Sequence, residues 1–138
     1  MKIIKYEDKY RDDMIFMILE AKNTLGRVPG LNEDLLDIKR NYLDAGDMFW
    51  LAINEQDRVI GSIGYNSIRD TDEVWLHRLF VKYNLKRQGI GSALLEMAEN
   101  YIANQGKKVV RIHMGGDGFE ESKYFIPNMA MWSIGNAI

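Results

Sequence analysis

The chain contains no cysteine among its 138 residues, so it has no disulfide, no thiolate metal ligand and no cysteine nucleophile. Its only two histidines, His77 and His113, are far apart in the sequence and form no cluster of metal ligands. Long apolar runs are missing too, and the charged start MKIIKYEDKY lacks the apolar segment of a signal peptide. We therefore expect no metal, no membrane association and a cytoplasmic location.

An excess of either charge is also missing. The 18 basic and 20 acidic residues leave a net charge of -2, which gives no overall attraction to nucleic acid. Hydrophobic residues make up 46% of the chain and charged residues 28%, as in globular proteins. This length and composition predict a single domain over residues 1–138.

Two hydrophobic periodicities follow one another along the chain. The pattern predicts strands at residues 2–6, 49–54, 59–68, 74–81 and 109–114, and helices at 14–21, 32–45 and 90–104. The order βααβββαβ predicts an α+β fold, with three α/β layers: a mixed, mostly antiparallel central sheet with helices on both faces.

Two glycines, Gly89 and Gly91, lie where a predicted strand gives way to a predicted helix. Free backbone N–H groups at a helix N-terminus bind anions, and glycine lets phosphate oxygens approach the main chain. Leu94 stands where a dinucleotide fingerprint needs a third glycine, and the Gly-Lys-Ser/Thr ending of a P-loop is missing. The turn therefore suits a pyrophosphate of another cofactor, and a tight turn without a ligand is the alternative.

The segment Lys86-Arg87-Gln88-Gly89-Ile90-Gly91 resembles motif A of the GNAT superfamily of acetyl-CoA-dependent N-acetyltransferases. Lys86 departs from that motif, which usually has Arg or Gln there. The resemblance extends over roughly residues 1–114 and implies that acetyl-CoA is the cosubstrate. It implies two sets of cofactor-binding residues: Leu79, Phe80 and Val81 for the pantetheine arm, and Lys86, Arg87, Gln88, Gly89, Ile90, Gly91 and Ser92 for the pyrophosphate.

The same resemblance implies that an amine attacks acetyl-CoA directly in a ternary complex, and the acceptor is a small-molecule or peptide amine. Such a reaction needs a general base, a general acid and a donor for the developing oxyanion. For the donor we favour the N–H of Val81 or of a neighbour on the same strand. The candidate catalytic residues are His113, Glu73 and Tyr124. His77 has the same side-chain parity as Leu79 and Val81, which would let it face the cleft, although a structural role at the sheet surface is the commoner one for such a histidine.

The resemblance ends in the C-terminal region, where Gly115-Gly116-Asp117-Gly118 leads into the tail, so we expect the last strands of the fold to be missing. An incomplete sheet has an unpaired edge, and a homodimer that covers it is a hypothesis. Two other functions stay open: a non-catalytic CoA-binding or regulatory module with the same fold, and an interaction domain without a cofactor.

Overall fold

The computed structural model describes residues 1–27, 30–113 and 121–126. The strands are β1 (Lys2–Lys5), β2 (Met48–Ile53), β3 (Val59–Ser67), β4 (Glu73–Val81), β5 (Val109–His113) and β6 (Glu121–Phe125). The α-helices are α1 (Arg11–Thr24) and α2 (Ile90–Asn104), and the short helices are η1 (Asp8–Tyr10), η2 (Glu33–Leu36) and η3 (Lys39–Leu43).

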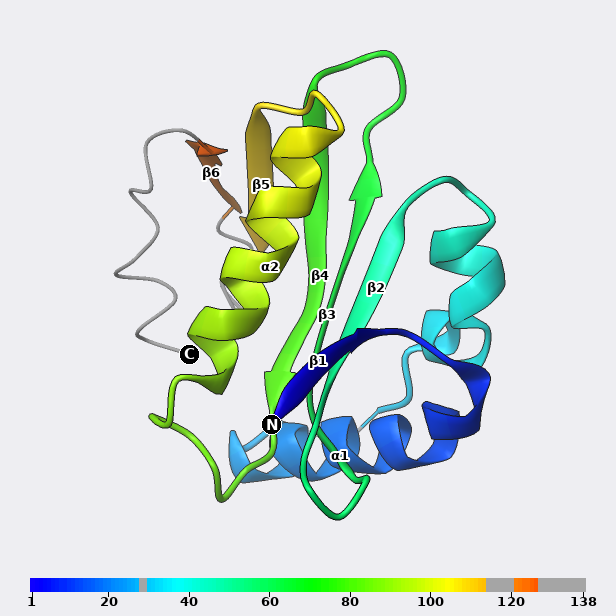
Figure 1. Ribbon diagram of the computed structural model, residues 1–138, viewed down its shortest axis with the longest axis vertical. Helices are drawn as coiled ribbons and strands as arrows, with labels where there is room; N and C mark the ends of the chain where they lie inside the picture. The colour runs from blue at the N-terminus through cyan, green and yellow to red at the C-terminus, as the bar shows by residue number, and fades with distance from the viewer. Residues whose placement is uncertain (28–29, 114–120, 127–138) are drawn as a thin grey trace.

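The six strands form one sheet in the order β1-β2-β3-β4-β5-β6 (Figure 1). Neighbouring strands are antiparallel except β4 and β5, which are parallel because α2 connects them as a crossover. The predicted mixed, mostly antiparallel sheet is therefore confirmed.

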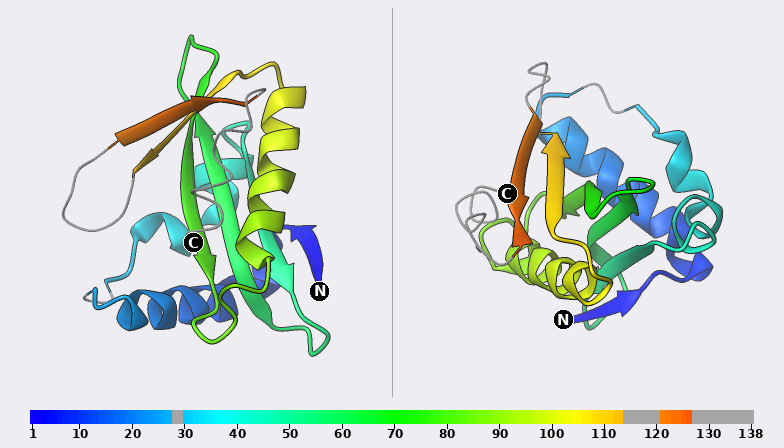
Figure 2. Two further views of the ribbon diagram at one scale, coloured as in Figure 1. Left: turned by 90° about the vertical axis from the view of Figure 1, so that its left-hand side faces the viewer. Right: turned by 90° about the horizontal axis from the view of Figure 1, so that it is seen from above.

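Helices cover both faces of the sheet, as predicted (Figure 2). One face packs on α2 through a cluster that includes Trp50, Val74 and Leu94. The other packs on α1 and the short helices through a cluster that includes Met14, Tyr42 and Phe49. Strand β2 is apolar along nearly its whole length because both of its faces are buried.

Two segments differ from the sequence prediction. The single helix expected from Asn32 to Gly46 is instead two short helices, η2 and η3, interrupted at Asp37, whose backbone is extended (φ -146°). Leu36, at the end of η2, is exposed. Residues 121–125, for which the sequence pattern predicted no strand, form β6 against β5. The later part of the tail lies outside the described residues.

We expect Gly64→Ala to lower the free energy of unfolding by about 1–3 kcal/mol, because overpacking of a dense core is costly. A β-carbon on Gly64 would overlap the ring of Phe49 and lie 3.1 Å from Cε1 of Tyr42. Gly30→Ala is the matched control, since a β-carbon there meets no atom within 4 Å. Urea unfolding of both variants tests this, and equal stabilities would contradict the tight packing.

Candidate active site

Strands β4 and β5 pair only at the start of β4 and then separate. The two strands pair only from Glu73 to Trp75 on β4, although β4 continues to Val81. Figure 2 (left) shows β5 diverging from β4, with α1 below it on the same side of β4. The second half of β4 therefore has one edge that no strand of the described chain pairs.

A β-bulge lies at the start of this unpaired half. Ser62 of β3 is opposite Phe80 and Gly64 is opposite His77, so three steps along β4 match two along β3. Arg78 has a left-handed backbone (φ 56°), and the Ser62 hydroxyl donates a 2.7 Å hydrogen bond to its carbonyl oxygen. The Ser62 hydroxyl therefore helps to hold the bulge in place.

The bulge changes which face each side chain of β4 occupies. Leu79 and Val81 pack against the α2 side of the sheet, whereas the ring of His77 packs on Tyr42 on the α1 side. The shared parity predicted for His77, Leu79 and Val81 is therefore wrong, because an extra residue in a strand reverses the alternation after it.

The N–H of Val81 points toward the unpaired edge. The next N–H along the chain, that of Lys82, donates to the carbonyl oxygen of Ile60 on the β3 side (2.9 Å). Successive N–H groups of a strand point in opposite directions. The N–H of Val81 is thus a hydrogen-bond donor on the free edge of β4, and it faces the space between β4 and the diverging β5.

The glycine turn precedes α2 at the same end of the sheet as the free half of β4 (Figure 1). Arg87 and Gly89 both have left-handed backbones (φ 66° and 84°), and a β-carbon on Gly89 would meet nothing within 4 Å. Gly89 is the N-cap residue of α2, and no side chain caps this helix. The first N–H groups of α2 therefore have no capping hydrogen bond and can donate to a ligand. This open, glycine-lined helix N-terminus fits a pyrophosphate.

A half-buried ion pair joins the bulge to η2. Arg78 donates two hydrogen bonds to Asp34, Nε to Oδ2 at 3.0 Å and Nη2 to Oδ1 at 2.9 Å, and the Tyr42 hydroxyl donates a third at 2.7 Å. Burial alone would raise the pKa of Asp34, but the hydrogen bonds from Arg78 and Tyr42 outweigh it and hold that pKa below its usual value. Asp34 is therefore ionised at neutral pH and fixes the Arg78 side chain.

We expect Asp34→Asn to lower the free energy of unfolding by about 2 kcal/mol at pH 7, because removing one charge of this half-buried pair leaves the Arg78 charge unpaired. The lowered pKa of Asp34 means that its stabilisation is present above the carboxyl range and is lost as the pH falls below about 4. Urea unfolding of wild type and variant should therefore converge toward acid pH. A difference that does not depend on pH would show that the charge of Asp34 is not the cause.

His77 lies next to the bulge, on the α1 side. Its ring is 6.4 Å from that of Tyr42, centroid to centroid, and it has no hydrogen-bond partner among the described residues. Burial lowers the pKa of His77 to about 4, and the charge of Arg78 adds to the effect. The imidazole is thus neutral at pH 7, with a lone pair free to accept a proton.

The three predicted catalytic residues lie in different places. The ring of His113, on the β5 side of the split, stacks on Trp75 at 4.6 Å. Glu73 accepts a 2.7 Å hydrogen bond from Arg111 in the paired half of β4. Tyr124 lies on β6 and is buried against α2. Burial raises the pKa of Tyr124, and the nearby Glu99 carboxylate raises it further. Only His113 lies near the split, and the catalytic role of all three stays a prediction.

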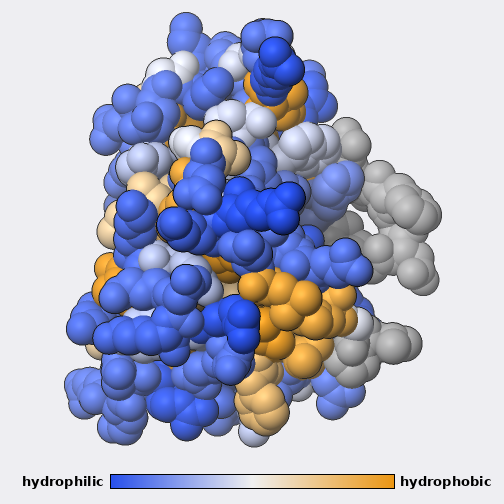
Figure 3. Space-filling view, turned by 90° about the vertical axis from the view of Figure 1, so that its right-hand side faces the viewer, coloured by the Kyte–Doolittle hydropathy of each residue, from blue (hydrophilic) through white to orange (hydrophobic). Residues whose placement is uncertain are grey.

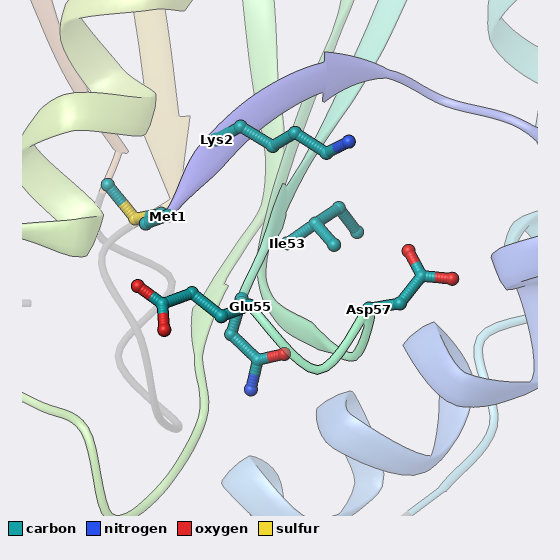
Figure 4. Close-up of a pocket in the computed structure, with 6 residues that line it drawn as sticks. Met1, Lys2, Ile53, Glu55 and Asp57 are labelled. Atoms are coloured by element: carbon teal, nitrogen blue, oxygen red, sulfur yellow. The ribbon is translucent and has the colours of Figure 1, made fainter.

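A separate shallow hollow lies at the β1 edge of the sheet, opposite β5 and β6 (Figure 4). Lys2 of β1 and two acidic residues of the β2–β3 turn, Glu55 and Asp57, line it. Asp57 already accepts a 2.6 Å hydrogen bond from the Tyr10 hydroxyl. The candidate site does not include this hollow.

The described part of the chain contains no group of three or more histidine or carboxylate side chains placed to hold a metal ion. None of the helices in residues 1–27, 30–113 and 121–126 combines the length and the apolar character that a membrane span needs.

Known proteins with similar sequences are acetyltransferases. The chain is 32% identical over 87 residues to N-acetyltransferase 8 of Homo sapiens, which covers 59% of this chain and 38% of that protein. It is 27% identical over 123 residues to N-acetyltransferase family 8 member 2 of Rattus norvegicus, which covers 78% of this chain and 54% of that protein. The chain thus spans about two fifths to about half the length of these relatives.

Solved structures give the same result. A GNAT-family acetyltransferase from Staphylococcus aureus Mu50 superposes with a TM-score of 0.76 at 28% identity, covering 82% of this chain and 73% of that one. A GNAT-family acetyltransferase from Brucella melitensis in complex with acetyl-CoA has a TM-score of 0.66 at 14% identity, over 86% and 78% of the two chains, and shows the shared fold alone. The sequence pattern of the acetyltransferase (GNAT) family matches residues 13–118. The chain therefore belongs to the GNAT acetyltransferase family.

Proposed function

We propose that this protein transfers an acetyl group from acetyl-CoA to an amine that attacks directly in a ternary complex. The observation that carries the proposal is the glycine turn at the open N-terminus of α2, beside the unpaired half of β4. An anion site and a free strand edge next to each other suit a cofactor that has both a pyrophosphate and an amide-containing arm.

The residues of the turn would hold the cofactor. The main chain at Gly89, Ile90 and Gly91 would bind the pyrophosphate, and the free edge of β4 from Leu79 to Val81 would bind the pantetheine arm. Arg87 and Gln88 are exposed beside the turn and add donors. Acetyl-CoA supplies an activated thioester when bound, and the N–H of Val81 would stabilise negative charge on its carbonyl oxygen.

His77 is the general base that the geometry favours. It adjoins the bulge, whereas Glu73 is paired with Arg111 and Tyr124 is buried against α2. A nitrogen that is bonding to an acyl carbon becomes much more acidic than a free ammonium, so an imidazole of low basicity can accept its proton.

The charged and titratable groups around His77 come from every neighbouring element. They are Arg78 on β4, Asp34 on η2, Tyr42 on η3, Asp47 before β2 and His113 on β5. Arg78 and His113 disfavour a proton on His77, and Asp34 and Asp47 favour one. Burial outweighs all of them, which keeps the lone pair available across the neutral range.

The function is tested by mixing the purified chain with acetyl-CoA and a panel of amines, and by measuring the free thiol of CoA. We expect thiol release that depends on the amine, together with an N-acetylated product seen by mass spectrometry. Acetyl-CoA binding without release on any amine would favour a non-catalytic CoA-binding module instead.

A further inference from the structure

Lys22, near the end of α1, is a buried cation without an anionic partner among the described residues. The residue is only 9% exposed. Its ammonium donates to two neutral oxygens, the carbonyl of Gly30 at 3.0 Å and the side-chain carbonyl of Asn32. Buried ammonium groups are costly unless an opposite charge compensates them. Lys22 therefore lacks the partner that a buried lysine normally has.

The neighbours of Lys22 add positive charge. Arg78 and Arg27 both lower the pKa of Lys22, on top of the larger effect of burial, and Asp34 opposes them. Asp34 is already bonded to Arg78 and Tyr42. Because Asp34 is engaged by Arg78, it leaves an excess of positive charge around Lys22 among the described residues.

This cation group lies on the α1 side of the unpaired half of β4. The Lys22 ammonium is 5.9 Å from the centroid of the Phe80 ring, and Arg78 is two residues before Phe80. Phe80 belongs to the segment proposed to hold the pantetheine arm. The positive charge therefore lies on the α1 side of the sheet, next to the strand segment that is proposed to hold the pantetheine arm.

We propose that Lys22 and Arg27 bind the carboxylate of the acceptor, so that the substrate is an amine that also carries a carboxylate. The inference rests on the proposed acetyl transfer. A carboxylate there would supply the missing opposite charge, and it would hold the amine near His77 and the bulge.

Exposed apolar residues of the same region indicate which kind of side chain the acceptor carries besides its amine and carboxylate. Leu25, Leu31 and Leu36 follow α1 and are each more than two fifths exposed. Figure 3 shows a compact apolar area on the side of the molecule that carries η2 and α1. An acceptor with an apolar side chain suits this surface, which guides the choice of probe.

The test compares leucine with 3-methylbutylamine, the same amine without the carboxylate, as acceptors of acetyl groups. We expect kcat/KM to be about 50-fold higher for leucine, and Lys22→Gln to reduce that ratio to below about 5, since charge-assisted hydrogen bonds are strong. Lys22→Arg should restore most of the ratio. Lys9→Gln, a lysine at the other end of the α1 region, is the matched control and should keep the wild-type ratio.

A purely structural lysine gives a different result, because Lys22→Gln would then lower kcat/KM for both acceptors by the same factor. Such an equal loss would overturn the proposal. A wild-type ratio of kcat/KM for leucine to kcat/KM for 3-methylbutylamine near one, or no turnover of leucine, would overturn it as well. The titration with acetyl-CoA and the acetylation of amines without a carboxylate are independent of it. Positive results there with a leucine ratio near one would reject the carboxylate site and leave the acetyl transfer intact.

Discussion

Gly89→Asp is expected to weaken acetyl-CoA binding at least about 100-fold, or about 2.7 kcal/mol. The new carboxylate would project into the open space in front of the glycine, where the pyrophosphate is proposed to lie. Two like charges about 4 Å apart near a protein surface repel each other by about 4 kcal/mol, which is enough for this loss. Calorimetric titration of the variant with acetyl-CoA measures it.

The chain offers a matched control for this variant at the other end of α2. Gly106 is also left-handed (φ 81°), and a β-carbon on it also meets nothing within 4 Å. Gly106→Asp therefore has a similar backbone cost and the same change in charge, but it is far from the turn. It should bind acetyl-CoA like the wild type. If both variants bind alike, the pyrophosphate is not at Gly89.

His77→Gln is expected to lower kcat about 100-fold, the lower range for the loss of a positioned base. Affinity for acetyl-CoA should stay within about 3-fold of wild type, since the ring packs on Tyr42 on the α1 side and not on the cofactor segment. Steady-state kinetics with the best amine of the panel measure kcat, and calorimetry measures the affinity.

The pH profile gives a second readout. Because the pKa of His77 is lowered to about 4, wild-type kcat should be flat between pH 6 and 8 and should fall only as the pH approaches 5. His113→Gln is the control, as the other histidine near the split, and should lower kcat less than about 5-fold if its role is to stack on Trp75. A larger loss in His113→Gln than in His77→Gln would reassign the base to His113.

Local sequence signals predicted much of the fold correctly. The extended apolar runs that became β2, β3 and β4, and the helical spacing of α2, are signals that neighbouring residues carry by themselves. The glycine turn was found because the need for left-handed backbones and close approach selects glycine. Its left-handed neighbour Arg87 shows that a non-glycine residue also adopts this conformation there.

The features that the sequence did not predict depend on contacts between distant segments. The bulge at Arg78 is held by Ser62 of another strand, so no local pattern marks it, and the facing of His77 was wrong for that reason. The break between η2 and η3 at Asp37 interrupts a regular apolar spacing. Strand β6 follows the glycine-rich stretch Gly115-Gly116-Asp117-Gly118, and this composition gave no indication in the sequence that a strand pairing with β5 would follow.

The same reason explains which site residues were missed. Asp34 and Arg78 are 44 positions apart in the sequence and meet only in the folded chain. Lys22 looks like an ordinary surface residue of a helix until its burial is known. The homodimer stays a prediction. Phe125 on the edge strand β6 is 58% exposed, which gives that prediction a surface to probe by light scattering.

The most direct test of the cofactor site is a calorimetric titration of the wild-type chain with acetyl-CoA and, in parallel, with acetyl-pantetheine. The second ligand has the same thioester but no phosphate. We expect one acetyl-CoA bound per chain and at least about 30-fold weaker binding of acetyl-pantetheine, because phosphate binding at a helix N-terminus should supply much of the affinity. Equal affinity for the two ligands, or no heat with acetyl-CoA, would contradict a pyrophosphate site at the N-terminus of α2.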